Sequence, residues 1–169
     1  MFHTLQTLLL LIFPALVIVA GLRDAATYTI PNWISIALAV AFPFAAVALD
    51  LPMHVILVQL GVGALALVVG IAMYSVKWIG GGDAKLFAAA ALWIGWPATV
   101  LFLGMTGLAG GALAVALLGL RSPVLRPFMP AGPGWFARLV APGQSVPYGM
   151  AIAVGALAAF PHAALFDHY

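Results

Sequence analysis

Long apolar stretches that carry almost no charge constrain this chain more than any other feature. Hydrophobic residues make up 66% of its 169 positions, and Asp, Glu, Lys and Arg together make up 6%. A soluble domain carries about 25% charged residues, and a soluble globule of this size would expose large apolar patches and aggregate. The composition therefore excludes a soluble enzyme, a nucleic-acid-binding domain and a disordered tail, and it indicates an integral membrane protein.

Six apolar runs are separated by breaks at charged residues, Pro and Gly. They are Leu5–Leu22, Trp33–Leu49, Met53–Val76, a shorter run from about Asp83 to Gly95, Ala98–Leu120 and Pro147–Phe160. A transmembrane helix needs about 20 mostly apolar residues. We therefore expect an all-α, polytopic membrane protein with about six transmembrane helices, forming one integral membrane domain over residues 1–169 with no soluble domain.

The basic residues predict the orientation in the membrane. If the N-terminus lies outside, the inner segments are 23–31, 77–85 and 121–146. These segments contain every Lys and Arg of the chain, namely Arg23, Lys77, Lys85, Arg121, Arg126 and Arg138. This distribution follows the positive-inside rule. We therefore expect both termini outside and the three basic segments in the cytoplasm.

Three further patterns are typical of helix packing and of the membrane surface. Small residues that let helices approach closely recur in the fifth run, at Gly104, Gly107, Gly110 and Gly111. Trp93 and Trp96 are expected at the outer membrane interface, where aromatic residues gather. The segment Gly134–Val140 is compatible with a helix that lies flat on the inner surface.

Two of the four aspartates fall in the inner segments. Asp24 follows the first run and Asp83 begins the fourth, so the intervening spans return the chain to the same side. Two neighbouring carboxylates can share one proton, because two like charges cannot both ionise cheaply at short distance. The charged member can act as a base on water while the protonated member donates to a carbonyl oxygen. Such a pair could hydrolyse a peptide bond, although Asp83 could equally be a helix cap after a glycine turn.

The remaining side chains offer no competing chemistry. The four histidines and the other two aspartates, Asp50 and Asp167, fall on the outer side, so the inner serines lack a histidine base. The chain has no Cys, and its histidines have no metal-ligand spacing. We expect no metal and no cofactor. Two other classes of membrane protein remain open, namely a small proton-coupled transporter and a scaffold subunit.

The chain contains Gly80-Gly81-Gly82-Asp83, Asp24 followed by Ile30-Pro31-Asn32, and Val146-Pro147-Tyr148-Gly149. Together these three elements resemble the type IV prepilin peptidase family of intramembrane aspartyl proteases. Gly80-Gly81-Gly82-Asp83 matches the Gly-x-Gly-Asp motif of that family, and Ala84-Lys85-Leu86 continues it. Asp24 stands six residues before Ile30-Pro31-Asn32, and the family places its first catalytic Asp just before such an Ile-Pro-Asn element. Val146-Pro147-Tyr148-Gly149 resembles its Pro-[Phe/Tyr]-Gly element. The three elements occur in the family's order.

The resemblance implies an enzyme that removes the short basic leader of prepilin-like proteins at the cytoplasmic face of the bacterial inner membrane. It assigns Asp24 and Asp83 as the catalytic pair. It places Gly80, Gly82, Lys85, Pro31, Asn32, Pro147 and Tyr148 at motif or substrate-positioning sites. The implied partners are the prepilin substrate and the lipid bilayer, and no nucleic acid. The short 23–31 segment and the absence of Cys argue against the methyltransferase activity of larger members and resemble the minimal branch that serves Flp-type pili.

Overall fold

The computed structural model describes residues 2–122, 124–125 and 132–168, and within these ranges it contains helices and no strand. The expected all-α fold is therefore confirmed. The helices are α1 (Phe2–Thr27), α2 (Asn32–Ala48), α3 (Met53–Ser75), α4 (Gly81–Ile94), α5 (Ala98–Leu120), α6 (Gly134–Leu139) and α7 (Tyr148–Ala159), followed by the 3-10 turns η2 (Phe160–His162) and η3 (Ala164–His168).

Four helical stretches of the described chain are long and apolar enough to cross a membrane. They are His3–Thr27, Met53–Ser75, Ala98–Leu120 and Tyr148–Phe166. Helix α2 is a shorter apolar helix, and α4 has only 14 residues. The fourth run is therefore short, as its sequence predicts. The helices are those of a polytopic membrane protein.

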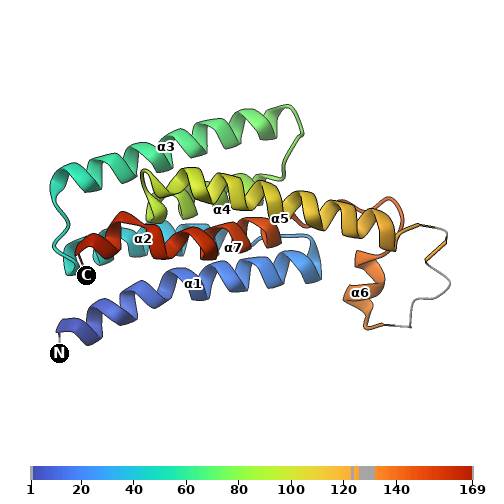
Figure 1. Ribbon diagram of the computed structural model, residues 1–169, viewed down its shortest axis with the longest axis horizontal. Helices are drawn as coiled ribbons and strands as arrows, with labels where there is room; N and C mark the ends of the chain where they lie inside the picture. The colour runs from blue at the N-terminus through green and yellow to red at the C-terminus, as the bar shows by residue number, and fades with distance from the viewer. Residues whose placement is uncertain (1, 123, 126–131, 169) are drawn as a thin grey trace.

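Helix α4 lies at the centre of the bundle and contacts every other long helix (Figure 1). Helix α3 packs on α4, α5 packs mainly on α7, and α1 lies against α7 and α2. Both chain termini lie at one end of the bundle, and α6 lies at the other (Figure 1). The second end also holds the last turn of α1 and the first turns of α2, α4 and α7, so these segments meet there.

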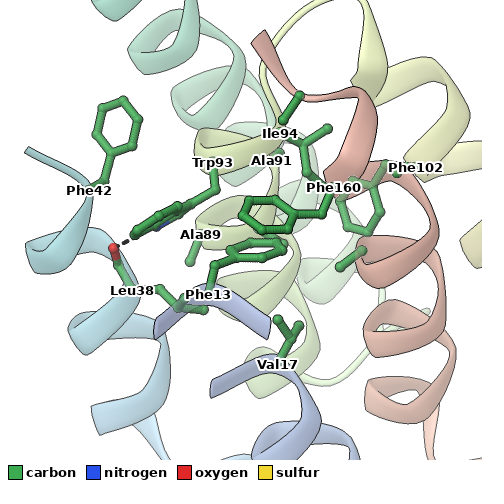
Figure 2. Packing of buried hydrophobic residues seen from close by; sticks show 14 of the residues in the cluster. Phe13, Val17, Leu38, Phe42, Ala89, Ala91, Trp93, Ile94, Phe102 and Phe160 are labelled. Carbon is green, nitrogen blue, oxygen red and sulfur yellow. Dashed lines mark hydrogen bonds between the residues drawn. The ribbon is translucent and has the colours of Figure 1, made fainter. Parts of the chain in front are cut away.

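The core is built around Trp93 of α4, which is completely buried (Figure 2). Its ring lies 5.5 Å from that of Phe13 and 6.0 Å from that of Phe42, measured between centroids. Its Nε1 donates a hydrogen bond of 2.8 Å to the carbonyl oxygen of Leu38. The expectation that Trp93 lies at the membrane interface is therefore wrong, because a satisfied indole N–H lets this ring be buried. Trp96 is 59% exposed, as an interfacial residue would be.

The glycines of α5 only partly follow their expected role in packing. An added Cβ at Gly110 would lie 3.1 Å from the ring of Tyr148, so this glycine does admit a neighbouring helix. An added Cβ at Gly104, Gly107 or Gly111 would meet no described atom within 4 Å. Helix α5 packs mainly on α7, and these three glycines lie outside that contact.

Candidate active site

Asp24 lies inside the last turn of α1 and not beyond the end of the helix. The apolar run ends near Leu22, but the helix continues to Thr27 because Ala25 and Ala26 are strong helix formers. Tyr28, with a φ of 55°, closes the helix, and its N–H donates to the carbonyl oxygen of Asp24 at 2.8 Å. This extra turn places the Asp24 side chain in the bundle, where it is only 5% exposed.

The first turn of α7 holds the Asp24 carboxylate. The N–H of Gly149 donates a hydrogen bond of 2.7 Å to Oδ2 of Asp24. An added Cβ at Gly149 would lie 2.8 Å from both Cβ and Oδ2 of Asp24, and 2.7 Å from Cδ1 of Ile30. Distances this short are severe overlaps, so only glycine fits at this position.

Asp83 lies in the first turn of α4 and is half-buried. Its Oδ2 accepts a hydrogen bond of 3.2 Å from the N–H of Gly80. The carboxylate therefore caps the start of its own helix. It also lies near enough to Asp24 for the two carboxylate charges to interact. The structure thus brings the two inner aspartates together at one end of the bundle.

Gly80 and Gly82 are required by close contacts and not by an unusual backbone conformation. Gly80 has a φ of −72°, and the described glycines with positive φ are Gly95 and Gly143. An added Cβ at Gly80 would lie 2.8 Å from Oδ2 of Asp83. An added Cβ at Gly82 would lie 3.1 Å from Cβ of Ile30 and 3.3 Å from its carbonyl oxygen. The absence of a side chain at Gly80 and Gly82 therefore leaves room for Asp83 and Ile30.

Ile30 connects the two halves of the site. This buried residue, 9% exposed, stands just before α2. Its backbone faces Gly82, next to Asp83, while its Cδ1 faces Gly149, which holds Asp24. Ile30 and Gly149 were not among the site residues that the sequence analysis selected. Ile30 belongs to the Ile-Pro-Asn element and Gly149 to the Pro-Tyr-Gly element. Membership in these motifs was the sequence signal that could have identified them.

The other positions singled out in the sequence surround this centre. Pro31 precedes α2, and Nζ of Lys85 donates a hydrogen bond of 3.0 Å to Oδ1 of Asn32, which ties α4 to α2. Pro147 is buried and immediately precedes α7. The Tyr148 ring packs against Gly110 of α5. The hydrogen bond to Asp24 comes from the next residue, Gly149.

Two arginines organise the chain around α6 at this end of the bundle. Arg121, just after α5, donates hydrogen bonds to the carbonyl oxygens of Leu139, Gln144 and Ser145, at distances from 2.6 to 3.0 Å. Arg138 of α6 donates to the carbonyl oxygen of Ala26 at 2.9 Å. Arg121 thus anchors the segment that leads into Gly149, and Arg138 anchors the end of the helix that carries Asp24. The expected Gly134–Val140 segment is helical over Gly134–Leu139.

The chemistry available here is that of two carboxylates. Within the described ranges, no three His, Asp or Glu side chains are grouped so as to hold a metal ion. Oδ2 of each acid accepts a backbone N–H, and Oδ1 of each has no hydrogen-bond partner in the part of the chain that the structure describes. Each carboxylate is therefore oriented by one oxygen and can react through the other.

A family model, described as the type IV leader peptidase family, matches residues 11–115. The chain belongs to this family. It is a peptidase, and membership in the leader peptidase family favours hydrolysis over the transporter and scaffold alternatives. The searches of curated proteins and of solved structures found no match. The segment that matches the leader peptidases contains both Asp24 and Asp83 but ends before Pro147 and Gly149.

Proposed function

We propose that the protein is a membrane-embedded aspartyl endopeptidase that removes the short basic leader of prepilin-like substrates, with Asp24 and Asp83 as its catalytic pair. One observation carries the proposal. In a family of leader peptidases, this chain holds two aspartates that are far apart in the sequence close to the same residue, Ile30, at one end of the bundle. The proposed site is the cytoplasmic face of the bacterial inner membrane.

The distribution of basic residues supports this orientation. Arg23, Lys77, Lys85, Arg121 and Arg138 all belong to helix ends or loops at the end of the bundle that holds the two acids. The sixth basic residue, Arg126, lies outside the described residues. Because basic segments remain in the cytoplasm, the acids would meet the substrate where its leader is presented, before its apolar helix enters the membrane.

In the proposed reaction the two carboxylates share one proton. The ionised member takes a proton from a water molecule, whose oxygen attacks the carbonyl carbon of the scissile peptide bond. The protonated member gives its proton to the carbonyl oxygen, and a tetrahedral diol forms. The C–N bond then breaks as the leaving nitrogen takes the proton that the first carboxylate removed from water, while the second carboxylate takes a proton from a hydroxyl of the diol. The products are a free leader carboxyl group and a new N-terminal amine. The N–H groups of Gly149 and Gly80 keep the two carboxylates in position.

The test is co-expression of the protein with a tagged prepilin, whose size reports leader removal. Asp24→Asn and Asp83→Asn keep the size of the side chain but remove its acid function, so each is expected to abolish cleavage while the protein still inserts in the membrane. Asp50→Asn is the matched control. Asp50 is exposed in the turn between α2 and α3, at the opposite end of the bundle, and its replacement should leave cleavage unchanged. Normal cleavage by either inner variant would refute the assignment.

A further inference from the structure

A lateral groove of about 510 Å³ runs between α2 and α3, with α4 as its floor. It exists because α2 and α3 both pack on α4 and scarcely contact each other. In Figure 1, α3 lies on the outer side of the bundle, along α4. Three of the large apolar side chains that line the groove remain exposed, with 59% of Ile36, 47% of Leu60 and 39% of Leu67 accessible. The groove is therefore open toward the surroundings of the bundle, which for these helices is the membrane.

The lining of the groove suits another helix. Small residues on α3 and α4 make up a third of it, namely Gly63, Ala64, Ala88 and Ala89. Gly63 already lets α3 pack closely on Leu92 of α4. The small and exposed Ala64 leaves room for the backbone of a second helix in the groove. The α2 wall runs from Asn32 to Ala39, and eight helical residues span about 12 Å, or two helical turns.

The end of the groove nearest the two acids is polar. Lys85 and Asn32 line it and are hydrogen-bonded to each other. One turn further along α2, Ser35 also lines the groove and is 7% exposed, and its hydroxyl has no hydrogen-bond partner in the described part of the chain. A buried hydroxyl without a partner is costly. A bound molecule that accepts a hydrogen bond would remove this cost.

We propose that this groove binds the apolar membrane helix of the leader-bearing substrate, and that Ser35 and Lys85 bind the carbonyl oxygens of the extended peptide just before that helix. This inference rests on the proposed function, since it places the substrate of the same site. Its main support is continuity. Lys85 and Asp83 both belong to the first two turns of α4, and Asn32 begins α2, so the polar end of the groove lies at the end of the bundle that holds the two acids.

The polar end of the groove suits a peptide segment that is not helical. An extended peptide segment has free carbonyl oxygens, whereas those of a helix are bonded within it. The polar end offers two donors, the ammonium group of Lys85 and the hydroxyl of Ser35, beside an otherwise apolar wall. This combination matches a chain that is extended at the membrane surface and helical below it.

Photocrosslinking tests the occupant directly. A benzoylphenylalanine residue is introduced at Leu67, which lines the groove, or at Val68, its neighbour on α3, which is 63% exposed and does not line it. The background is the full-length Asp83→Asn variant in membranes, and the probe is a tagged model prepilin with a basic leader and an apolar helix. We expect crosslinks to the prepilin from position 67 and none from position 68. Equal crosslinking at both positions, or crosslinks from position 67 to lipid alone, would overturn the proposal.

Steady-state cleavage of the same prepilin in detergent provides a second test. Ala64 lines the groove and is exposed, so Ala64→Phe fills the groove without disturbing the contact between α3 and α4. We expect it to raise KM about tenfold, equivalent to about 1.4 kcal/mol of binding, with kcat unchanged. Ala72→Phe, at an exposed alanine of α3 outside the groove, is the matched control and should leave both constants unchanged.

Removal of the unpartnered hydroxyl by Ser35→Ala should raise KM about two- to tenfold, the value of one hydrogen bond. An unchanged KM in both Ala64→Phe and Ser35→Ala would exclude the groove as the substrate site. The Asp83→Asn control separates this result from a failure of the proposed function. If that variant remains inactive, the peptidase assignment stands and only the groove is wrong.

Discussion

The backbone N–H of Gly149 donates a 2.7 Å hydrogen bond to Oδ2 of Asp24, although 125 positions separate the two residues in the chain. A buried carboxylate needs such a partner, because an unsatisfied polar group away from water costs free energy. The bond also fixes the rotation of the carboxylate, and thus the direction of its second oxygen. The last helix therefore orients an acid that the first helix carries.

Gly149→Ala should abolish or severely reduce leader cleavage. The new Cβ would overlap both Asp24 and Ile30 at less than 3 Å, and overpacking of this kind costs about 1–3 kcal/mol. Cleavage of a co-expressed prepilin and the melting temperature in detergent measure the two effects. Gly104→Ala is the control, since its Cβ would meet no described atom within 4 Å and alanine favours a helix. Full activity of Gly149→Ala would show that α7 can move away from Asp24 without consequence.

Two neighbouring glycines of the motif should respond differently to the same change. Gly82→Ala places a Cβ 3.1 Å from Ile30, so it should push the first turn of α4, with Asp83, away from that residue. Gly81→Ala brings a Cβ to 3.4 Å from the Tyr74 ring, an ordinary van der Waals contact. We therefore expect reduced prepilin cleavage for Gly82→Ala and nearly normal cleavage for Gly81→Ala. The reverse order would contradict the packing described here.

Arg121 is a positioning residue for the entry into α7. Arg121→Ala removes its hydrogen bonds to the carbonyl oxygens of Leu139, Gln144 and Ser145, so the segment before Gly149 should loosen. We expect slower leader cleavage together with faster limited proteolysis within residues 139–146. Arg23→Ala, at an exposed arginine in the last turns of α1, should change neither readout. Unaltered proteolysis in Arg121→Ala would exclude this anchoring role.

Trp93 should contribute to stability and not to chemistry. Trp93→Phe removes the hydrogen bond to Leu38 and leaves space in a completely buried site. A lost hydrogen bond and an unfilled cavity cost about 1–3 kcal/mol each. Thermal unfolding in detergent should show a clear decrease in melting temperature, while the folded fraction still cleaves the prepilin. Trp96→Phe, at a residue that is 59% exposed, should unfold like the unmodified protein.

The sequence predicts the helical class and most helix positions well, because hydrophobic run length controls both in a membrane. Helix α5 begins and ends at the residues expected from its run, Ala98 and Leu120. The placement of Asp24 and Asp83 at the same end of the bundle also follows from the number of transmembrane helices between them. The end of α1 was harder to predict, because polar residues that end an apolar run do not necessarily end a helix.

The remaining features depend on contacts between helices that no local pattern encodes. In the sequence, Trp93 resembles an interfacial residue. In the fold, its N–H donates to the carbonyl oxygen of Leu38, which allows the ring to be buried. A run of glycines before Asp83 suggests unusual backbone angles. In the fold, Asp83 leaves no room for a side chain at Gly80, and Ile30 leaves little room for one at Gly82. Gly149 belongs to a recognised motif, but its role depends on where α1 ends. Each of these features is a property of two segments that meet only in the folded bundle.

The hydrogen bond between α7 and α1 has a consequence for biosynthesis. Helices are made in chain order, so a nascent polypeptide that has completed α4 already contains both acids, while the donor that aligns one of them has not yet been translated. The carboxylate of Asp24 is thus aligned only after α7 has been made and has docked on α1. Alignment of this acid is in this way coupled to the synthesis of a helix that follows both aspartates in the chain.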